Sequence, residues 1–174
     1  IVRNVLKGME TETPAAKKTA AAPKLNGIFE TPEEAIAAAK AAQKEIQPMP
    51  LEFREKIIAN IRKKTLENAK MLSELAVEET GMGNVGHKII KHQLVAEKTP
   101  GTEDLTTIAW SGDRGLTLTE MGPWGVIGAV CPSTNPTCTV ICNSIGMLAA
   151  GNAVVFMPHP SAKNCSNLAI DMVN

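Results

Sequence analysis

Residues 125–162, GVIGAVCPSTNPTCTVICNSIGMLAAGNAVVFMPHPSA, decide the fold of this chain. The runs GVIGAVCP and NAVVFMP are short, apolar and rich in branched residues, which predicts two buried strands. Between them, Asn135 and Pro136 begin a predicted helix that ends just before Gly151. Another helix is expected from Ser161. This strand–helix–strand–helix order predicts an α/β fold with a parallel sheet.

The charged residues are concentrated in the first part of the chain. Eighteen basic and eighteen acidic residues cancel, and after Met121 only Lys163 and Asp171 are charged. We therefore expect a solvated, helix-rich first part and a last part built as core. The neutral balance and an aromatic content of 3% argue against a nucleic-acid partner. No run is long and apolar enough to predict a membrane span.

The length of 174 residues corresponds to about one domain. Because the chain begins at Ile1 and ends at Asn174 inside a helical pattern, we expect it to be a fragment of a longer protein. The chain has no apolar stretch followed by a cleavage site, and its four cysteines form no CxxC pair. Both features favour a cytoplasmic protein with reduced thiols.

The first nine residues, IVRNVLKGM, place their apolar side chains on one helical face. Residues 10–26 are rich in alanine, proline, threonine and lysine, a composition typical of flexible linkers. A short amphipathic helix on a tether cannot bury its apolar face alone, so we expect residues 1–9 to dock on a partner. The frayed end of an ordinary helix is the alternative.

Three helical segments follow the linker. Thr31 and Glu34 form a capping box, with Pro32 at the first helical position. The spacing of apolar residues predicts one bent helix or two helices over residues 51–80, and another helix over residues 87–98.

Residues 81–86, GMGNVG, match the glycine fingerprint G-x-G-x-x-G of dinucleotide sites. That motif requires a preceding strand, whereas the residues LSELAVEET before Gly81 have a helical pattern. We therefore expect a helix end and a loop here, and we assign no phosphate to the motif.

The turn PSTNP at residues 132–136 has the features of a site. Its two prolines fix φ on both sides of a turn at the carboxyl end of a strand. Pro136 suits the first helical position, which makes Asn135 the natural N-cap. The same position directs donors and the positive end of the helix dipole above the sheet, where an oxyanion would need them. Spacing alone leaves the helix cap and the catalytic donor equally open.

Five segments carry a resemblance to a known family: GVIGAVCPSTNP, NSIGMLAAGNAVVF, PHPSA, LAVEETGMG and AEKTPGTEDL. Over residues 26–174 the chain resembles the aldehyde dehydrogenase superfamily, and more narrowly the CoA-acylating propionaldehyde and acetaldehyde dehydrogenases that are cargo of bacterial microcompartments. The resemblance implies N-terminal helices followed by the start of a parallel Rossmann-like sheet. Residues 26–174 would then form the N-terminal part of an NAD- and CoA-binding domain that is incomplete in this chain.

The segment at residues 1–25 resembles an encapsulation peptide with its linker. This likeness implies that residues 1–9 bind a shell protein and that the enzyme resides in the lumen of a microcompartment. The resemblance also implies a homo-oligomer.

The activity implied by the resemblance is the oxidation of a short-chain aldehyde by NAD, with coenzyme A as co-substrate. A cysteine thiolate attacks the aldehyde, NAD accepts a hydride from the thiohemiacetal, and the thioester passes to CoA. This chemistry needs a thiol of lowered pKa and an oxyanion site. In the family the cysteine lies far downstream of PSTNP, so we expect it beyond Asn174. The choice between NAD and NADP and the preferred aldehyde stay open.

In ordinary members of the family the matching turn is P-W-N-F-P, and its Asn donates to the oxyanion. Aligned without gaps, that Asn falls on Thr134, while the Asn of this chain comes one position later. We favour Asn135 as the donor, because an amide is the better donor, and Thr134 is the second candidate. Pro132, Ser133 and Thr134 are also expected to line the cofactor site.

After the second strand, ordinary members carry a lysine for the adenosine ribose, where this chain has Met157 and Pro158. The PHPSA turn is the substitute in the CoA-acylating subgroup, and the resemblance places it in the nucleotide site. Pro158 and Pro160 would shape the wall, and His159 and Ser161 would reach ribose or adenine. Ser161 could also cap the next helix. A surface-loop histidine without a partner is the alternative for His159.

The cysteines and the other two histidines are expected to be structural. We expect a structural role for all four cysteines, because free cysteine is among the most buried residue types. Cys138 and Cys142 are four residues apart on one helical face, where a small apolar side chain packs well. His87 and His92 are expected on the solvated face of their helix. No set of these residues has the spacing of a metal site. The cysteines are Cys131, Cys138, Cys142 and Cys165.

Two alternatives to a CoA-acylating enzyme stay open. An ordinary aldehyde dehydrogenase would release a free acid, and it would need a general base and a water that the chain does not reveal. The PHPSA turn in place of lysine weighs against it. A binding or assembly module would carry the targeting helix and no activity.

Overall fold

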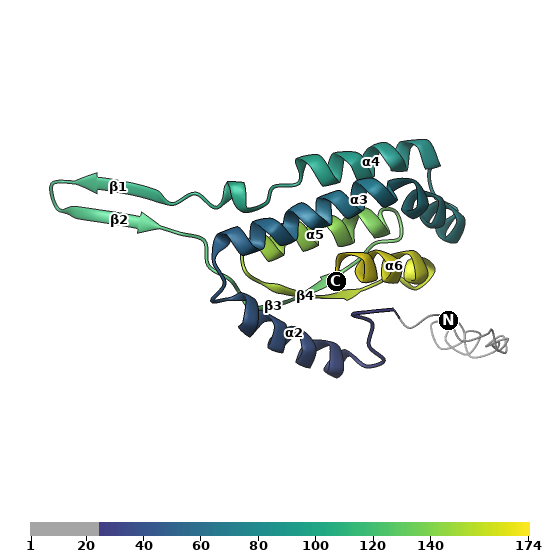
Figure 1. Ribbon diagram of the computed structural model, residues 1–174, viewed down its shortest axis with the longest axis horizontal. Coiled ribbons are helices and arrows are strands. Elements are labelled where there is room, and N and C mark those ends of the chain that lie inside the picture. Colours follow the sequence, from purple (N-terminus) through teal and green to yellow (C-terminus); the bar gives the residue numbers. More distant parts are fainter. Residues whose placement is uncertain (1–24) are drawn as a thin grey trace, which may run out of the picture.

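The computed structural model describes residues 25–174 (Figure 1). The docking helix predicted at residues 1–9 and most of the linker lie outside the described residues. The helices and strands are α2 (Pro32–Ile46), α3 (Leu51–Thr80), α4 (Val85–Lys98), η1 (Thr102–Asp104), β1 (Ile108–Gly112), β2 (Gly115–Thr119), β3 (Val126–Val130), α5 (Pro136–Ala149), β4 (Ala153–Met157), η2 (Pro160–Ala162) and α6 (Lys163–Val173).

The first three helices form from local signals that the sequence displays. The capping box at the start of α2 is present, and α3 is a single helix of 30 residues. Gly81 ends α3 with φ +66°, in the left-handed region that favours glycine. Asn84 begins α4, its Oδ1 accepting from the N–H of His87 at 3.3 Å. The glycine motif is therefore a helix end and a loop, as predicted: residues 81–84 join the two helices, and Val85 and Gly86 already belong to α4.

The sequence pattern does not predict the hairpin of β1 and β2, because it indicates a single strand in this region, at residues 117–122, TLTEMG. The two strands pair antiparallel, with Gly112 opposite Gly115, and Asp113 and Arg114 form the two-residue turn. Figure 1 shows the hairpin extending away from the helices. Every residue of both strands is exposed, so no burial pattern accompanies the pairing.

The predicted strand–helix–strand unit is present as β3, α5 and β4. β3 and β4 pair in parallel, from Val126 opposite Ala153 to Val130 opposite Met157. Gly151 follows α5 with φ +81°, which lets the chain turn sharply into β4. The α/β fold with helices before a parallel sheet is confirmed.

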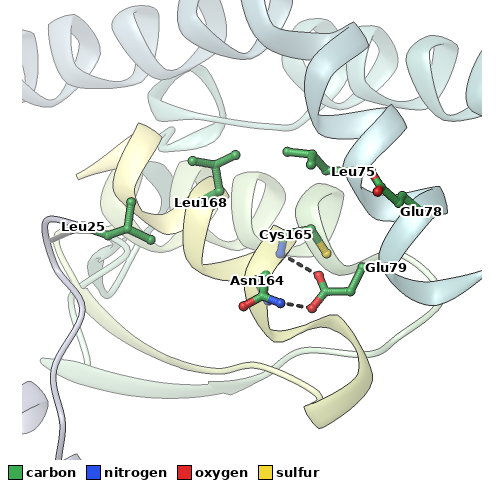
Figure 2. A pocket seen from close by; sticks show the side chains of 7 residues that line it. All are labelled: Leu25, Leu75, Glu78, Glu79, Asn164, Cys165 and Leu168. Carbon is green, nitrogen blue, oxygen red and sulfur yellow. Dashed lines mark hydrogen bonds between the residues drawn. The ribbon is translucent and has the colours of Figure 1, made fainter. Parts of the chain in front are cut away.

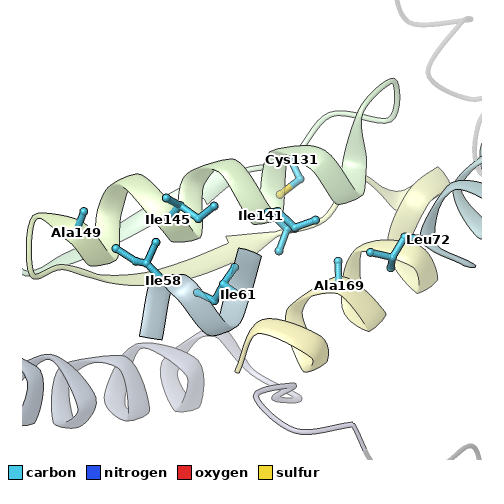
Figure 3. Packing of buried hydrophobic residues seen from close by; sticks show 9 residues of the cluster. Ile58, Ile61, Leu72, Cys131, Ile141, Ile145, Ala149 and Ala169 are labelled. Carbon is cyan, nitrogen blue, oxygen red and sulfur yellow. The ribbon is translucent and has the colours of Figure 1, made fainter. Parts of the chain in front are cut away.

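The core lies between helices on one side of this parallel pair. In Figure 1, α5 lies between the strands and α3, whereas α2 contacts both strands. α6 packs against α3 and α5. No helix between residues 25 and 174 is both long enough and apolar enough to cross a membrane. Figure 3 shows the central cluster, which consists of Ile58, Ile61, Leu72, Cys131, Val140, Ile141, Ile145, Ala149 and Ala169.

Candidate active site

The two proline-bounded turns leave the same edge of the parallel pair. Val130 and Met157 are partners in the ladder, and the N–H of Cys131 donates to the Met157 carbonyl at 2.9 Å. The turn at residues 132–136 follows β3 and the turn at residues 158–161 follows β4. The structure thus brings the predicted oxyanion turn and the predicted nucleotide turn together at the carboxyl ends of adjacent strands, where open α/β sheets bind ligands.

Asn135 occupies the N-cap position of α5, but its side chain does not cap the helix. Its Oδ1 instead accepts from Nζ of Lys91 at 3.0 Å. Within residues 25–174 the Nδ2 group makes no hydrogen bond with another residue. The amide therefore keeps its two N–H donors free at the positive end of α5, which is the arrangement that an oxyanion requires.

Thr134 is held through its backbone. Its carbonyl accepts from Nζ of Lys88 at 3.0 Å, and the side chain of Lys88 is buried while Thr134 is exposed. The Thr134 hydroxyl makes no hydrogen bond inside the described part of the chain. Ser133 is half-buried and Pro132 is exposed beside it. The second candidate donor is thus present, but no neighbour fixes the direction of its hydroxyl.

His92 is not on a solvated face, and the expectation for it is wrong. The side chain is fully buried, and its ring meets Ser73, Thr137 and the Lys88 carbonyl. Because a carbonyl only accepts, Nδ1 carries the proton and donates to Lys88 at 2.8 Å. Nε2 then accepts from the Thr137 hydroxyl at 2.8 Å. Burial lowers the pKa of His92, and the nearby Lys88 charge lowers it further, against the raising effect of the hydrogen bond to the Lys88 carbonyl. His87 is exposed, as expected.

Sequence reasoning missed the contribution of α4 to this site. Lys88, Lys91 and His92 bind Thr134, Asn135 and Thr137, so one helix holds the turn and the first turn of α5 at three points. The signal that could have revealed it is their spacing of three and four residues, which places these polar side chains on one helical face.

In the PHPSA turn, His159, Pro160 and Ser161 are exposed, whereas Pro158 is half-buried and Ala162 is buried. His159 has a partner after all: its Nδ1 accepts from the N–H of Ser161 at 3.2 Å and lies 2.8 Å from the Ser161 hydroxyl. Nε2 of His159 makes no hydrogen bond to residues 25–174. Pro160 begins η2, next to the exposed pair. A histidine nitrogen and a hydroxyl at a strand end fit the hydroxyl groups of a ribose.

Ser161 does not cap α6, because Glu79 from α3 takes that role. The Glu79 carboxylate accepts from the N–H groups of Asn164 at 2.8 Å and of Cys165 at 2.7 Å (Figure 2). Burial raises the pKa of Glu79, but these hydrogen bonds outweigh that effect and leave the pKa below its usual value. A carboxylate already occupies the first turn of α6, so this helix does not offer those N–H groups to a pyrophosphate.

The same contacts, at the start of α6 just after the PHPSA turn, border a pocket. It has a volume of about 450 Å³, is mostly apolar, and lies between α3 and α6. None of the predicted site residues lines it. The pocket therefore does not define the candidate active site. Its lining residues, drawn in Figure 2, are Leu25, Leu75, Glu78, Glu79, Asn164, Cys165 and Leu168.

Three of the four cysteines are buried as expected, and the expectation for Cys142 is wrong because that residue is exposed. Burial raises the pKa values of Cys131 and Cys138. Burial, together with the adjacent Glu79 carboxylate, raises the pKa of Cys165 to about 12. A thiol of raised pKa is a poor nucleophile at neutral pH. Among residues 25–174 no three or more histidine, cysteine or acidic side chains gather as a metal site.

Comparison with known proteins gives consistent matches along the chain. The model of the aldehyde dehydrogenase family matches residues 3–174. An acetaldehyde dehydrogenase (acetylating) from Bilophila wadsworthia is 52% identical over 180 residues, which cover 100% of this chain and 37% of the relative. The chain thus spans little more than a third of the length of that relative.

Two solved structures share the fold and much of the sequence. A propionaldehyde dehydrogenase from the fucose utilisation bacterial microcompartment of Clostridium phytofermentans is 66% identical, with a TM-score of 0.83 over 87% of this chain and 34% of that one. The propionaldehyde dehydrogenase of Rhodopseudomonas palustris with bound propionyl-CoA is 50% identical, with a TM-score of 0.83 over 94% of this chain and 37% of that one.

Proposed function

The chain belongs to the aldehyde dehydrogenase family, and we propose that it is the N-terminal part of a CoA-acylating aldehyde dehydrogenase. The proposed reaction converts a short-chain aldehyde, CoA and NAD to acyl-CoA and NADH. The relatives that support this reaction include an acetylating acetaldehyde dehydrogenase and a propionaldehyde dehydrogenase with bound propionyl-CoA. Residues 26–174 are proposed to contribute the oxyanion turn and part of the nucleotide site.

The observation that carries the proposal is the free amide of Asn135 at the start of α5. When a thiolate adds to the aldehyde carbon, a C–S bond forms and the carbonyl oxygen takes the negative charge. We propose that the N–H groups of Asn135 donate to that oxygen, and the helix dipole would favour the charge. Pro136 and the contacts from α4 hold the turn in place before substrate binds, so that little reorganisation is needed.

The PHPSA turn is proposed to hold the ribose of NAD. Pro158 and Pro160 would form the wall, and Nε2 of His159 and the Ser161 hydroxyl would contact the ribose. Pro132, Ser133 and Thr134 would face the cofactor from the neighbouring strand end. When bound, NAD supplies the hydride acceptor of the reaction.

The nucleophilic cysteine is proposed to lie beyond Asn174. Cys131, Cys138 and Cys165 are buried with raised pKa values, the opposite of what the chemistry requires. Cys142 is exposed but lies within α5, away from the free amide at its first turn.

The test is an assay of the full-length protein with propionaldehyde, NAD and CoA. We expect NADH and acyl-CoA to form in equal amounts, and residues 1–174 alone to give no turnover. NADH formation that does not depend on CoA and is accompanied by release of the free acid would favour an ordinary aldehyde dehydrogenase. Absence of NADH formation with the full-length protein would favour a non-catalytic module, and turnover by residues 1–174 would contradict the position of the cysteine.

The segment at residues 1–25 is proposed to direct the protein to a microcompartment shell through residues 1–9. The amphipathic pattern of residues 1–9 and the microcompartment origin of one similar structure support this proposal. Deletion of residues 1–9 should abolish co-sedimentation of the full-length protein with shell protein and leave its specific activity unchanged. Shell association that survives the deletion would count against targeting.

A further inference from the structure

We propose that Lys91 is a positioning residue that sets the orientation of the Asn135 amide and thereby directs its N–H groups to the substrate. The inference rests on the proposed function, in which Asn135 donates to the oxyanion. Lys91 belongs to α4 and lies outside the two turns, but the strength of Asn135 as a donor would depend on it.

The direction of the amide follows from the chemistry of the lysine side chain. An ammonium group has three donors and no acceptor, so the atom of Asn135 that lies 3.0 Å from Lys91 Nζ must be the oxygen. The Nδ2 group is then turned away from Lys91. Asn135 makes no capping bond, and no other residue of the described range 25–174 bonds its side chain. Among residues 25–174, Lys91 is therefore the residue whose hydrogen bond sets which way the amide faces.

The opposite orientation would be harmful to the reaction. A flipped amide would place a carbonyl oxygen, in place of two N–H groups, beside the charge that develops on the substrate oxygen. The ammonium also polarises the amide through its oxygen, which strengthens the N–H groups as donors. Lys91 thus favours the productive orientation and improves the donor.

The position of Lys91 is fixed by two neighbours on the same helical face. Lys88 donates to the Thr134 carbonyl at 3.0 Å, and His92 accepts from the Thr137 hydroxyl at 2.8 Å. These contacts lie on either side of Asn135 in the sequence. They fix the distance between α4 and the turn at residues 132–136. The exposed side chain of Lys91 is therefore held within reach of the Asn135 oxygen.

The test uses the full-length protein and compares three substitutions at position 91. Lys91→Met should lower kcat about tenfold, and Lys91→Arg should retain most of the rate because a guanidinium also only donates. Lys91→Glu should lower kcat further, by about 100-fold, since a carboxylate accepts and would turn the N–H groups toward itself. The KM for aldehyde should change little. Lys98→Glu makes the same charge change at an exposed position of α4 and should leave kcat within about twofold.

The decisive comparison repeats the series in an Asn135→Ala background. If Lys91 acts through Asn135, the three substitutions should then have equal rates within about twofold. Losses that persist unchanged without Asn135, or a Lys91→Glu variant no slower than Lys91→Met, would overturn the inference.

A crystal structure of the Lys91→Glu variant supplies a readout besides activity. The carboxylate at position 91 should contact the amide of Asn135, and because a carboxylate only accepts, the contacting amide atom would be Nδ2. If the two side chains do not touch, the proposed role of residue 91 in orienting the amide is contradicted. If the wild-type protein gives no CoA-dependent turnover, the proposed function is wrong. The crystal structure of the Lys91→Glu variant then still shows whether residue 91 determines the orientation of the Asn135 amide.

Discussion

Replacement of Asn135 by alanine in the full-length protein should lower kcat for aldehyde oxidation by about 100- to 1000-fold, the typical cost of losing one preorganised oxyanion donor. The N–H groups of the amide have no partner among residues 25–174, and the amide oxygen accepts a hydrogen bond from Lys91. Because the side chain makes no helix-capping bond, its removal should change the thermal unfolding midpoint by no more than a few degrees. Steady-state rates at saturating NAD and CoA, with a melting curve, measure both effects.

Two matched variants sharpen this expectation. Asn135→Asp keeps the size and the contact with Lys91 but has no N–H group, so it should lose about as much rate as alanine. Thr134→Val removes the competing hydroxyl and should lower kcat less than tenfold, since only the backbone of Thr134 is fixed. A larger loss in Thr134→Val than in Asn135→Ala would assign the role to Thr134.

Replacement of His92 by leucine should lower the free energy of unfolding by about 3 kcal/mol at pH 7.5. The substitution leaves the Thr137 hydroxyl and the Lys88 carbonyl buried without the partners that His92 supplies. It also removes one of the three contacts by which α4 holds the turn and the start of α5, so kcat should fall as well. Chemical denaturation measures the stability, and His87→Leu, at an exposed position of the same helix, is the control with an expected change below about 0.5 kcal/mol.

The effect of His92 should depend on pH in a defined direction. Burial, with the Lys88 charge, lowers the pKa of His92 in the folded protein, whereas the unfolded chain protonates it near 6.5. The unfolded state therefore binds more protons below about pH 6.5, and the stability that His92 contributes is lost as the pH falls. The stability gap between the wild type and His92→Leu should narrow from pH 7.5 to pH 5. A gap that stays constant or widens would contradict a buried neutral imidazole.

Much of the fold could be predicted because its signals are local. The capping box of α2, the glycine at the end of α3 and the proline at the start of α5 act within a few residues. The apolar runs of β3 and β4 and the helix between them specify the parallel pair for the same reason. The resemblance located the two turns, and the structure places them at one edge of that pair.

The supports of the site could not be predicted, since they join distant parts of the sequence. Lys88, Lys91 and His92 contact residues 44 to 46 positions away. Glu79 caps α6 from 85 and 86 positions away, which removes the need for a local cap at Ser161. A helical pattern predicts a face but does not specify which partner covers it.

The error at Cys142 has a related cause. Cys138 and Cys142 are one turn apart on α5, which predicted a common burial. The structure covers Cys138 and leaves Cys142 exposed, so the face that the two cysteines share is not buried throughout. The hairpin was missed because its first strand, IAWSG, does not alternate apolar and polar residues, so only a strand overlapping β2 was predicted.

The most direct test of the oxyanion turn is a crystal structure of the full-length protein with an acyl group bound as thioester to its cysteine. The proposal predicts that Nδ2 of Asn135 lies about 3 Å from the acyl carbonyl oxygen, with Lys91 still on the amide oxygen. An acyl oxygen that contacts only the Thr134 hydroxyl, or that lies away from residues 132–136 altogether, would contradict it.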